Sequence, residues 1–129
     1  MKLYKDLRTR FKKDIKRGAC YCILCGNKIE NYKDLSLEHL TPIARVNYKL
    51  AAKSYNIYPA IRIINTIKGS LLFCEWMNER VDLLQNSLEN HKLTTHERIL
   101  VEKALESTYT YNIDPCDFCI MYKYCQNCH

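Results

Sequence analysis

The feature that most constrains this chain is its set of eight cysteines among 129 residues. Six of them form Cys-x-x-Cys pairs, at Cys22/Cys25, Cys116/Cys119 and Cys125/Cys128. The first residues show no secretory signal, and no apolar run approaches the roughly 20 residues that span a bilayer. In an intracellular chain such pairs are typical of metal ligands rather than disulfides. We therefore expect a cytoplasmic protein without membrane segments, in which metal helps to hold the fold.

The last two pairs lie in a short cysteine-rich tail at residues 113–129. Five residues separate the two pairs, so that four thiolates fall within 13 residues. Four thiolates close a tetrahedral coordination sphere, which predicts a structural Zn²⁺ site. Its ligands would be Cys116, Cys119, Cys125 and Cys128. An iron–sulfur cluster is the alternative, because clusters use the same ligand set.

The first pair forms a turn of the kind found in metal knuckles. Gly26 follows Cys25 directly, and glycine tolerates the positive φ that is needed after the second thiolate. Two partitions of the cysteines stay open. Cys22 and Cys25 either form a second site with Cys20 or Cys74, or remain free. Alternatively, they share a Zn²⁺ with one of the tail pairs, which would attach the C-terminus to the knuckle.

The N-terminal segment, residues 1–18, is strongly basic. It holds eight Lys or Arg and two Asp, which accounts for the whole net charge of +6. Apolar residues recur at four-residue intervals from Leu3 to Ile15, which predicts a helix with an apolar face inward and a basic face outward. A basic element on a neutral body favours contact with nucleic-acid phosphates, and we expect Lys12 and Lys16 to make such contacts.

The rest of the chain predicts a single α+β domain, mostly α. Its 47% hydrophobic and 26% charged residues are typical of a folded protein of this length. We expect a helix over residues 43–55, a second helix that begins at Pro59, and further helices over residues 71–107. Thr94 and Glu97 form a capping-box pattern, which predicts the start of the last of these helices.

The most chemically informative stretch is Glu38-His39-Leu40-Thr41-Pro42, at the end of a short strand predicted over residues 34–40. A carboxylate and an amide oxygen are ligands that Mg²⁺ or Mn²⁺ accepts, so Glu38 and Asn65 form a candidate cation site. His39 can take a proton from water for attack on phosphorus. The cation would stabilise the charge that develops on the phosphate.

Two further polar residues complete this constellation. Asn56 is a candidate for holding the loop that carries the imidazole. Lys68 lies one helical turn beyond Asn65 and is a candidate phosphate contact.

The segment 20–70 resembles the HNH family of nucleases. That family combines a Cys-x-x-Cys pair, an acidic residue–His–x–x–Pro motif, a central Asn and an Asn (or His)-x-x-Lys-Gly motif. The corresponding residues here are Cys22/Cys25, Glu38-His39-Leu40-Thr41-Pro42, Asn56 and Asn65-Thr66-Ile67-Lys68-Gly69. The resemblance implies that residues 19–70 form a ββα-metal core. It also implies that His39 is the general base, Glu38 and Asn65 are metal ligands, and Asn56 orients His39.

The sequence departs from the family pattern at two places. Glu38 stands where aspartate is the commoner residue. Zinc-bearing members carry a second Cys-x-x-Cys just before the final Asn, and Ile61 and Ile64 occupy those positions here. Cys22 and Cys25 therefore lack their usual partners, which a tail pair would replace in the second of the two partitions.

These patterns and the resemblance predict an HNH endonuclease that hydrolyses phosphodiester bonds, with DNA as the expected substrate and RNA as the alternative. The expected nucleic-acid contacts are Lys68, Arg62, Lys12 and Lys16. Cleavage of both strands by so small a chain would favour a homodimer or a larger protein complex. The alternative is a non-catalytic zinc-containing nucleic-acid-binding module with a degenerate HNH core. A further alternative is an interaction subunit whose cysteine tail binds a partner protein.

Overall fold

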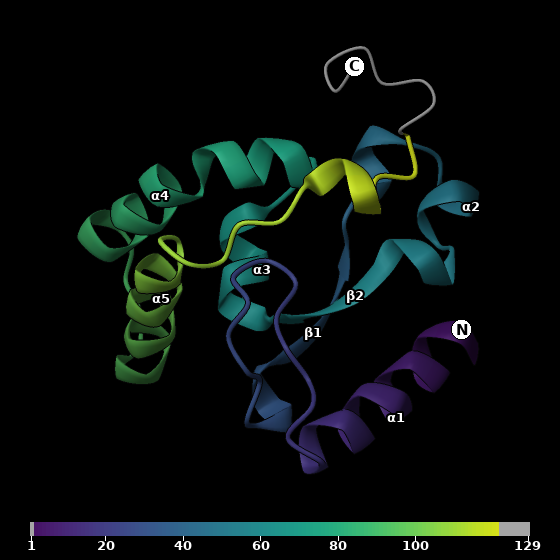
Figure 1. Cartoon of the computed structure of the whole chain (residues 1–129), viewed down its shortest axis with the longest axis horizontal. Helices are drawn as coiled ribbons and strands as arrows, with labels where there is room; N and C mark the ends of the chain where they lie inside the picture. Colours follow the sequence, from purple (N-terminus) through teal and green to yellow (C-terminus); the bar gives the residue numbers. More distant parts are fainter. Residues whose placement is uncertain (1, 122–129) are drawn as a thin grey trace.

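A computed structural model describes residues 2–121, and helices dominate this part of the chain (Figure 1). The sheet in the described range has two antiparallel strands, β1 (Leu35–His39) and β2 (Ile57–Ile61). Helix α3 (Arg62–Lys68) follows β2 directly. The strand predicted over residues 34–40 is confirmed, and so is the α+β, mostly helical class.

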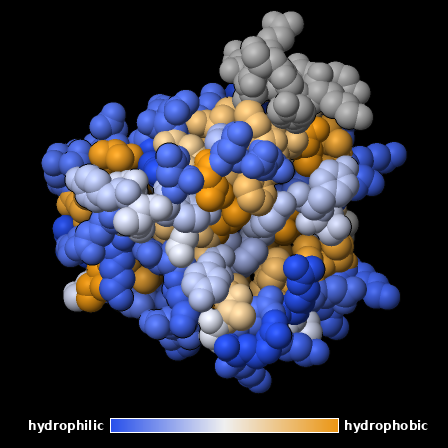
Figure 2. All heavy atoms as spheres, viewed as in Figure 1, coloured by the Kyte–Doolittle hydropathy of each residue, from blue (hydrophilic) through white to orange (hydrophobic). Residues whose placement is uncertain are grey.

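The basic N-terminal segment forms helix α1 (Lys2–Lys16), as predicted. Leu7 and Phe11 are buried on its inner face, and its lysines and arginines remain exposed. The helix runs along one side of the β1–β2 sheet, and α4 and α5 lie on the other side of the molecule (Figure 1). In the same view hydrophilic residues cover the edge that α1 forms (Figure 2). The apolar residues of α1 therefore attach it to the core and its charges face outward.

Two longer helices cover α3 on the side away from the sheet. These are α4 (Phe73–Asn90) and α5 (Thr95–Ser107), and they pack against each other and against α3. The predicted capping box is confirmed, because the Thr94 hydroxyl accepts a hydrogen bond from Glu97 N and the Glu97 carboxylate accepts one from Thr94 N. Within residues 2–121, no helix has the length and apolar character to cross a membrane.

The helix predicted over residues 43–55 is wrong. The structure has two 3₁₀ turns there (Ile43–Arg45 and Ser54–Asn56) and one short helix between them, α2 (Tyr48–Ala51). The Asn47 side chain accepts a hydrogen bond from Leu50 N, which caps α2 at its first turn and separates it from the preceding turn. Local polar caps thus divide a stretch whose apolar spacing suggested one helix.

The prediction that Pro59 begins a helix is also wrong. Pro59 lies in the middle of β2 opposite Leu37, and the helix begins three residues later at Arg62. The Pro59 carbonyl accepts a hydrogen bond from Ile23 N, on the edge of β2 away from β1. The N and O of one strand residue point to the same edge, so the missing proline N–H removes no hydrogen bond between β1 and β2.

The knuckle turn at residues 22–26 is held by the helical part of the chain. Consecutive backbone carbonyls in this turn accept hydrogen bonds from side chains of α4, α5 and the segment after α5. The pairs are Tyr111 Oη with Ile23 O, Trp76 Nε1 with Leu24 O at 2.9 Å, and Ser107 Oγ with Cys25 O at 2.8 Å. Gly26 has the expected positive φ, at 79°, and its Cα faces the ring of Tyr111. Protein hydrogen bonds therefore close this turn.

Candidate active site

The β1–β2–α3 unit brings three of the predicted site residues to one place. Glu38 and His39 are the last two residues of β1, and Asn65 lies in the middle of α3, which packs on the sheet. All three line an open hollow of about 260 Å³, whose rim includes Pro42 and Gly69. A carboxylate, an imidazole and a carboxamide therefore face one solvent-accessible space.

Glu38 is buried, with 3% of its surface exposed. Its Oε1 accepts a hydrogen bond from Lys68 Nζ at 3.0 Å, and its Oε2 is buried without a partner among residues 2–121. Burial raises the pKa of Glu38 to about 7, although the positive charge of Lys68 opposes this shift. A buried carboxylate oxygen without a partner, on a residue that lines a hollow, is a group that a hydrated cation can satisfy.

Lys68 lies inside the protein. Its side chain is 0% exposed and its ammonium group forms an ion pair with Glu38. The sequence suggested a phosphate contact on the surface, but α3 is covered by the sheet on one side and by α4 and α5 on the other (Figure 1). The face that carries Lys68 is therefore an interior face, and the ammonium group is not available to solvent.

His39 is partly buried and contacts helix α1. Its Nε2 lies 3.1 Å from the hydroxyl oxygen of Tyr4, and the two rings meet edge to face at 5.7 Å. Burial lowers the pKa of His39, and the charge of Lys68 lowers it further. The imidazole is therefore neutral at neutral pH, as a general base must be. When Nε2 carries the proton and donates it to Tyr4, Nδ1 is the nitrogen that can accept a proton.

Tyr4 itself is part of a short chain of hydrogen bonds. Burial raises the pKa of the Tyr4 hydroxyl, and a hydrogen bond with Tyr48 of α2 adds to that shift. The hydroxyl therefore stays protonated at neutral pH. Three segments that are distant in the sequence, α1, α2 and the end of β1, thus meet at the Tyr4 hydroxyl.

Asn56 is fully buried and holds the loop that follows β1. Its Oδ1 accepts a hydrogen bond from Thr41 N at 3.0 Å. Its Nδ2 donates to the carbonyls of Thr41 and Ala51, at 3.0 and 2.9 Å. The backbone carbonyl of Asn56 also accepts from Leu40 N. Asn56 thus fixes the two residues after His39, and it acts on the imidazole through the backbone.

Asn65 is held against the sheet. Its Nδ2 donates to Ser36 Oγ at 3.1 Å, and that hydroxyl donates to the Ala60 carbonyl of β2. With the nitrogen directed toward Ser36, Oδ1 is the Asn65 atom that a cation would use. The carboxamide is thereby positioned by both strands.

A basic groove runs from His39 between α1 and β1. It has a volume of about 260 Å³ and is lined by Tyr4, Arg8, His39 and Arg62, among others. Arg62 is exposed, and its guanidinium group donates to the Leu35 carbonyl at 2.6 Å. Tyr4 and Arg8 were not among the predicted site residues, although their four-residue spacing places them on one face of α1.

The other two predicted nucleic-acid contacts also lie on α1. Lys12 follows Arg8 by one turn, is exposed, and holds its ammonium group 4.0 Å from the centre of the Tyr32 ring. Lys16 is exposed at the end of the helix. The basic residues of α1 therefore extend from the groove at His39 along the outside of the molecule.

The knuckle cysteines face an apolar environment. Cys22 and Cys25 are buried in the core together with Ile61 and Ile64, the residues at the positions of the missing pair. Burial alone would raise the pKa of Cys22, but hydrogen bonds from Cys25 and from backbone N–H groups, including that of Ile61 at 3.2 Å, lower it. In the described part of the chain no three His, Cys, Asp or Glu side chains form a group that could hold a metal.

The remaining cysteines are divided between two regions. Cys20 is buried beside the knuckle, and burial raises the pKa of its thiol to about 11. Cys74, at the start of α4, lines the same small gap as Cys116 and Cys119. Cys125 and Cys128 lie outside the described residues, so the predicted four-cysteine site is not tested by the structure.

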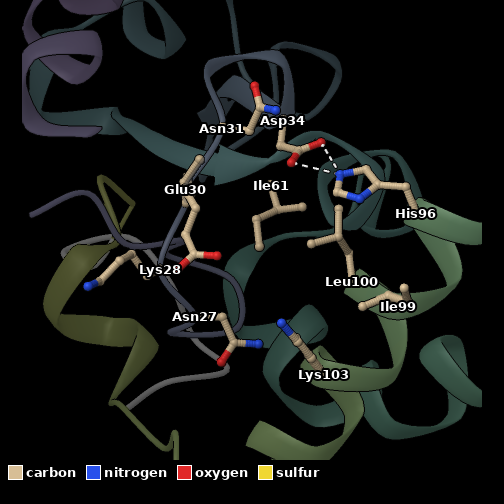
Figure 3. A pocket seen from close by; sticks show the side chains of 11 residues that line it. Asn27, Lys28, Glu30, Asn31, Asp34, Ile61, His96, Ile99, Leu100 and Lys103 are labelled. Carbon is tan, nitrogen blue, oxygen red and sulfur yellow. Dashed lines mark hydrogen bonds and ion pairs between the residues drawn. The ribbon is translucent and has the colours of Figure 1, made fainter. Parts of the chain in front are cut away.

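A larger cavity of about 430 Å³ lies between the segment 27–34, which follows the knuckle turn, and α5 (Figure 3). Apolar side chains of Ile61, Ile99 and Leu100 line it, and an ion pair between Asp34 and His96, at 2.9 Å, crosses its rim. It shares no lining residue with the hollow at Glu38. The smaller hollow combines the carboxylate, the imidazole and the carboxamide, so it is the candidate active site.

Comparisons with protein-family models, with curated proteins and with solved structures found no match to this chain. The functional assignment therefore depends on the residues of the site and on their geometry.

Proposed function

We propose that this protein is a metal-dependent endonuclease of the HNH type, which hydrolyses phosphodiester bonds in DNA. The observation that carries the proposal is the hollow at the β1–β2–α3 unit, where Glu38, His39 and Asn65 face one space. The order of these elements, two antiparallel strands followed by a helix, is the order that the HNH resemblance implies.

The donor groups fit a hard divalent cation. The unpartnered Oε2 of Glu38 and the Oδ1 of Asn65 are oxygen ligands, which suit Mg²⁺ or Mn²⁺. The remaining coordination positions would be left to water and to substrate phosphate, as is usual for Mg²⁺ in proteins. When bound, the cation supplies stabilisation of the charge that develops on the phosphate oxygens.

His39 is the general base in this proposal. Its lowered pKa keeps the ring neutral, and in the tautomer that carries the proton on Nε2, beside the Tyr4 hydroxyl, Nδ1 is left to take a proton from the attacking water. Asn56 holds the loop after His39 so that the ring keeps its position. Arg8 and Arg62 line the groove beside the ring, and they would bind the phosphates that flank the cleaved bond.

Removal of the Tyr4 hydroxyl is expected to slow cleavage without weakening DNA binding. Tyr4→Phe keeps the ring contact and removes the hydrogen bond to Nε2, which is worth about 1.4 kcal/mol or tenfold in rate. We expect kcat to fall about tenfold while KM for DNA changes little. Tyr109→Phe is the matched control, because Tyr109 is 91% exposed. If kcat of Tyr4→Phe equals that of the wild type, Tyr4 does not position the base.

We also propose that the cysteine tail binds one structural Zn²⁺. Elemental analysis of the purified protein is expected to find about one zinc per chain, because four thiolates close one tetrahedral site. Cys119→Ala should lose this zinc and Cys20→Ala should keep it. Loss of zinc in Cys22→Ala would show that the knuckle shares the ion. Iron in place of zinc would replace this assignment by an iron–sulfur cluster.

One observation favours a second candidate function, a nucleic-acid-binding module without catalytic activity. Lys68 already supplies a positive charge to Glu38, as expected for a site that has lost its cation. The experiment that separates the two candidates is conversion of supercoiled plasmid to nicked or linear DNA in the presence of Mg²⁺ or Mn²⁺. The nuclease proposal predicts conversion by the wild type and not by His39→Ala. The second candidate predicts DNA retention without conversion.

A further inference from the structure

The ion pair between Lys68 and Glu38 has a consequence for cation binding. Lys68 Nζ lies 3.0 Å from Glu38 Oε1, and the two side chains are 0% and 3% exposed. Among the described residues that line the hollow, Glu38 is the only acidic one. In the free protein, one buried ammonium group therefore already balances the ionised form of this carboxyl group, whose pKa burial raises to about 7.

A divalent cation at Glu38 Oε2 would share this carboxylate with the ammonium group. Three positive charges, two from the cation and one from the ammonium group, would then lie close to one carboxylate, and the buried ammonium group would repel the cation. The neutral amide of Asn65 does not reduce this excess. Charge balance needs further negative charge in the hollow, and a phosphodiester is the group that the proposed substrate would bring there.

The groove beside His39 is suited to bring that negative charge. Arg8 and Arg62 line it, and the hydrogen bond between the Arg62 guanidinium and the Leu35 carbonyl positions one of them. The guanidinium groups of the two arginines attract phosphate whether or not a metal ion is present. DNA can therefore bind before the cation does.

We propose that Lys68 makes cation binding at this site dependent on bound nucleic acid. The free protein binds Mn²⁺ or Mg²⁺ weakly, and a bound phosphodiester strengthens ion binding by supplying the missing negative charge. Because such coupling is reciprocal, the cation strengthens DNA binding by the same factor. This inference rests on the proposed nuclease function, and it assigns Lys68 a regulatory role within that site.

The first experiment measures Mn²⁺ binding to the protein alone, from the electron paramagnetic resonance signal of free Mn²⁺. The wild type is expected to bind weakly, and Lys68→Met is expected to bind at least about tenfold more tightly, within the usual range of coupling between sites. Lys68→Gln repeats the test with a neutral side chain that can still donate to Glu38. Lys92→Met is the matched control, since Lys92 is an exposed lysine between α4 and α5 that does not line the hollow. Circular dichroism confirms that each variant is folded.

The second experiment measures the reciprocal effect on DNA binding and needs no Lys68 variant. The anisotropy of a fluorescent DNA duplex is recorded with the His39→Ala protein, which leaves the DNA intact. Mn²⁺ is expected to strengthen DNA binding by about tenfold or more, the size of a typical coupling. The same titration in the His39→Ala/Lys68→Met protein should show a smaller gain.

The outcomes separate this inference from the proposed function. Two results would overturn the role of Lys68 and leave the nuclease proposal standing. In the first, the wild type without DNA binds Mn²⁺ as tightly as Lys68→Met does. In the second, Mn²⁺ binds the free protein but leaves its affinity for DNA unchanged. If no protein binds Mn²⁺, with or without DNA, the cation site itself is wrong, and both proposals fall.

Discussion

Replacement of His39 by alanine is expected to reduce plasmid cleavage by about 10²- to 10⁴-fold, the usual contribution of a general base. His39 lines the hollow with Glu38 and Asn65, and its lowered pKa keeps it neutral. The substitution removes the proton acceptor and leaves the proposed cation ligands in place. DNA binding should change little, because the arginines of the neighbouring groove remain. The measurement is the initial rate of nicking of supercoiled plasmid in Mn²⁺ buffer, beside the anisotropy of a labelled duplex.

His91→Ala is the matched control for this substitution. His91 is an exposed histidine that follows the last turn of α4 and is not among the residues that line the hollow. It should cleave at the wild-type rate. A His39→Ala protein that is folded and cleaves as fast as His91→Ala would remove His39 from the mechanism.

Replacement of Asn56 by alanine is expected to have the largest effect on stability. The side chain is fully buried and makes three hydrogen bonds to the backbone of Thr41 and Ala51. Alanine would leave buried backbone groups without partners, at about 1–3 kcal/mol for each group, and would open a cavity. We expect the free energy of unfolding to fall by roughly 3–5 kcal/mol, a large part of the 5–15 kcal/mol that is typical of a domain.

Urea denaturation of the wild type and Asn56→Ala measures this loss directly. Asn90→Ala is the control, because Asn90 is an exposed asparagine near the end of α4 whose side chain bonds only a neighbouring side chain among the described contacts. It should change stability by less than about 0.5 kcal/mol. A loss below about 1 kcal/mol for Asn56→Ala would mean that Asn56 does not hold the loop after His39.

The parts of the fold that were predictable depend on local signals. The four-residue apolar spacing of α1 and the capping box of α5 are contained within single elements, and both are confirmed. Pro59 shows the limit of such signals, since proline suits both the first turn of a helix and the free edge of a strand. Pairing with β1, a contact across more than 20 residues of sequence, decides between the two.

The candidate site also combines residues that a local pattern identifies with contacts that only the folded chain creates. Glu38, His39 and Asn65 are candidates from the sequence because their side chains are chemically distinctive and occur in the order of a known family, and the structure brings them to one hollow. The buried environment of Lys68 could not be predicted in this way. Helix α3 has seven residues, which is too short for the spacing of its apolar residues to show that both of its faces are covered. The contact between Tyr4 and His39 joins residues 35 positions apart, and no local pattern predicts it.

The most direct test of the account is the metal dependence of phosphodiester cleavage by the unaltered protein. Supercoiled plasmid is incubated with the wild type in Mn²⁺, in Mg²⁺ and in excess EDTA, and the nicked and linear products are measured over time. The nuclease proposal predicts cleavage with either cation and none in EDTA, with restoration when Mn²⁺ is added back. A wild-type protein that binds DNA but leaves it intact under every condition, or that cleaves equally in EDTA, would contradict it.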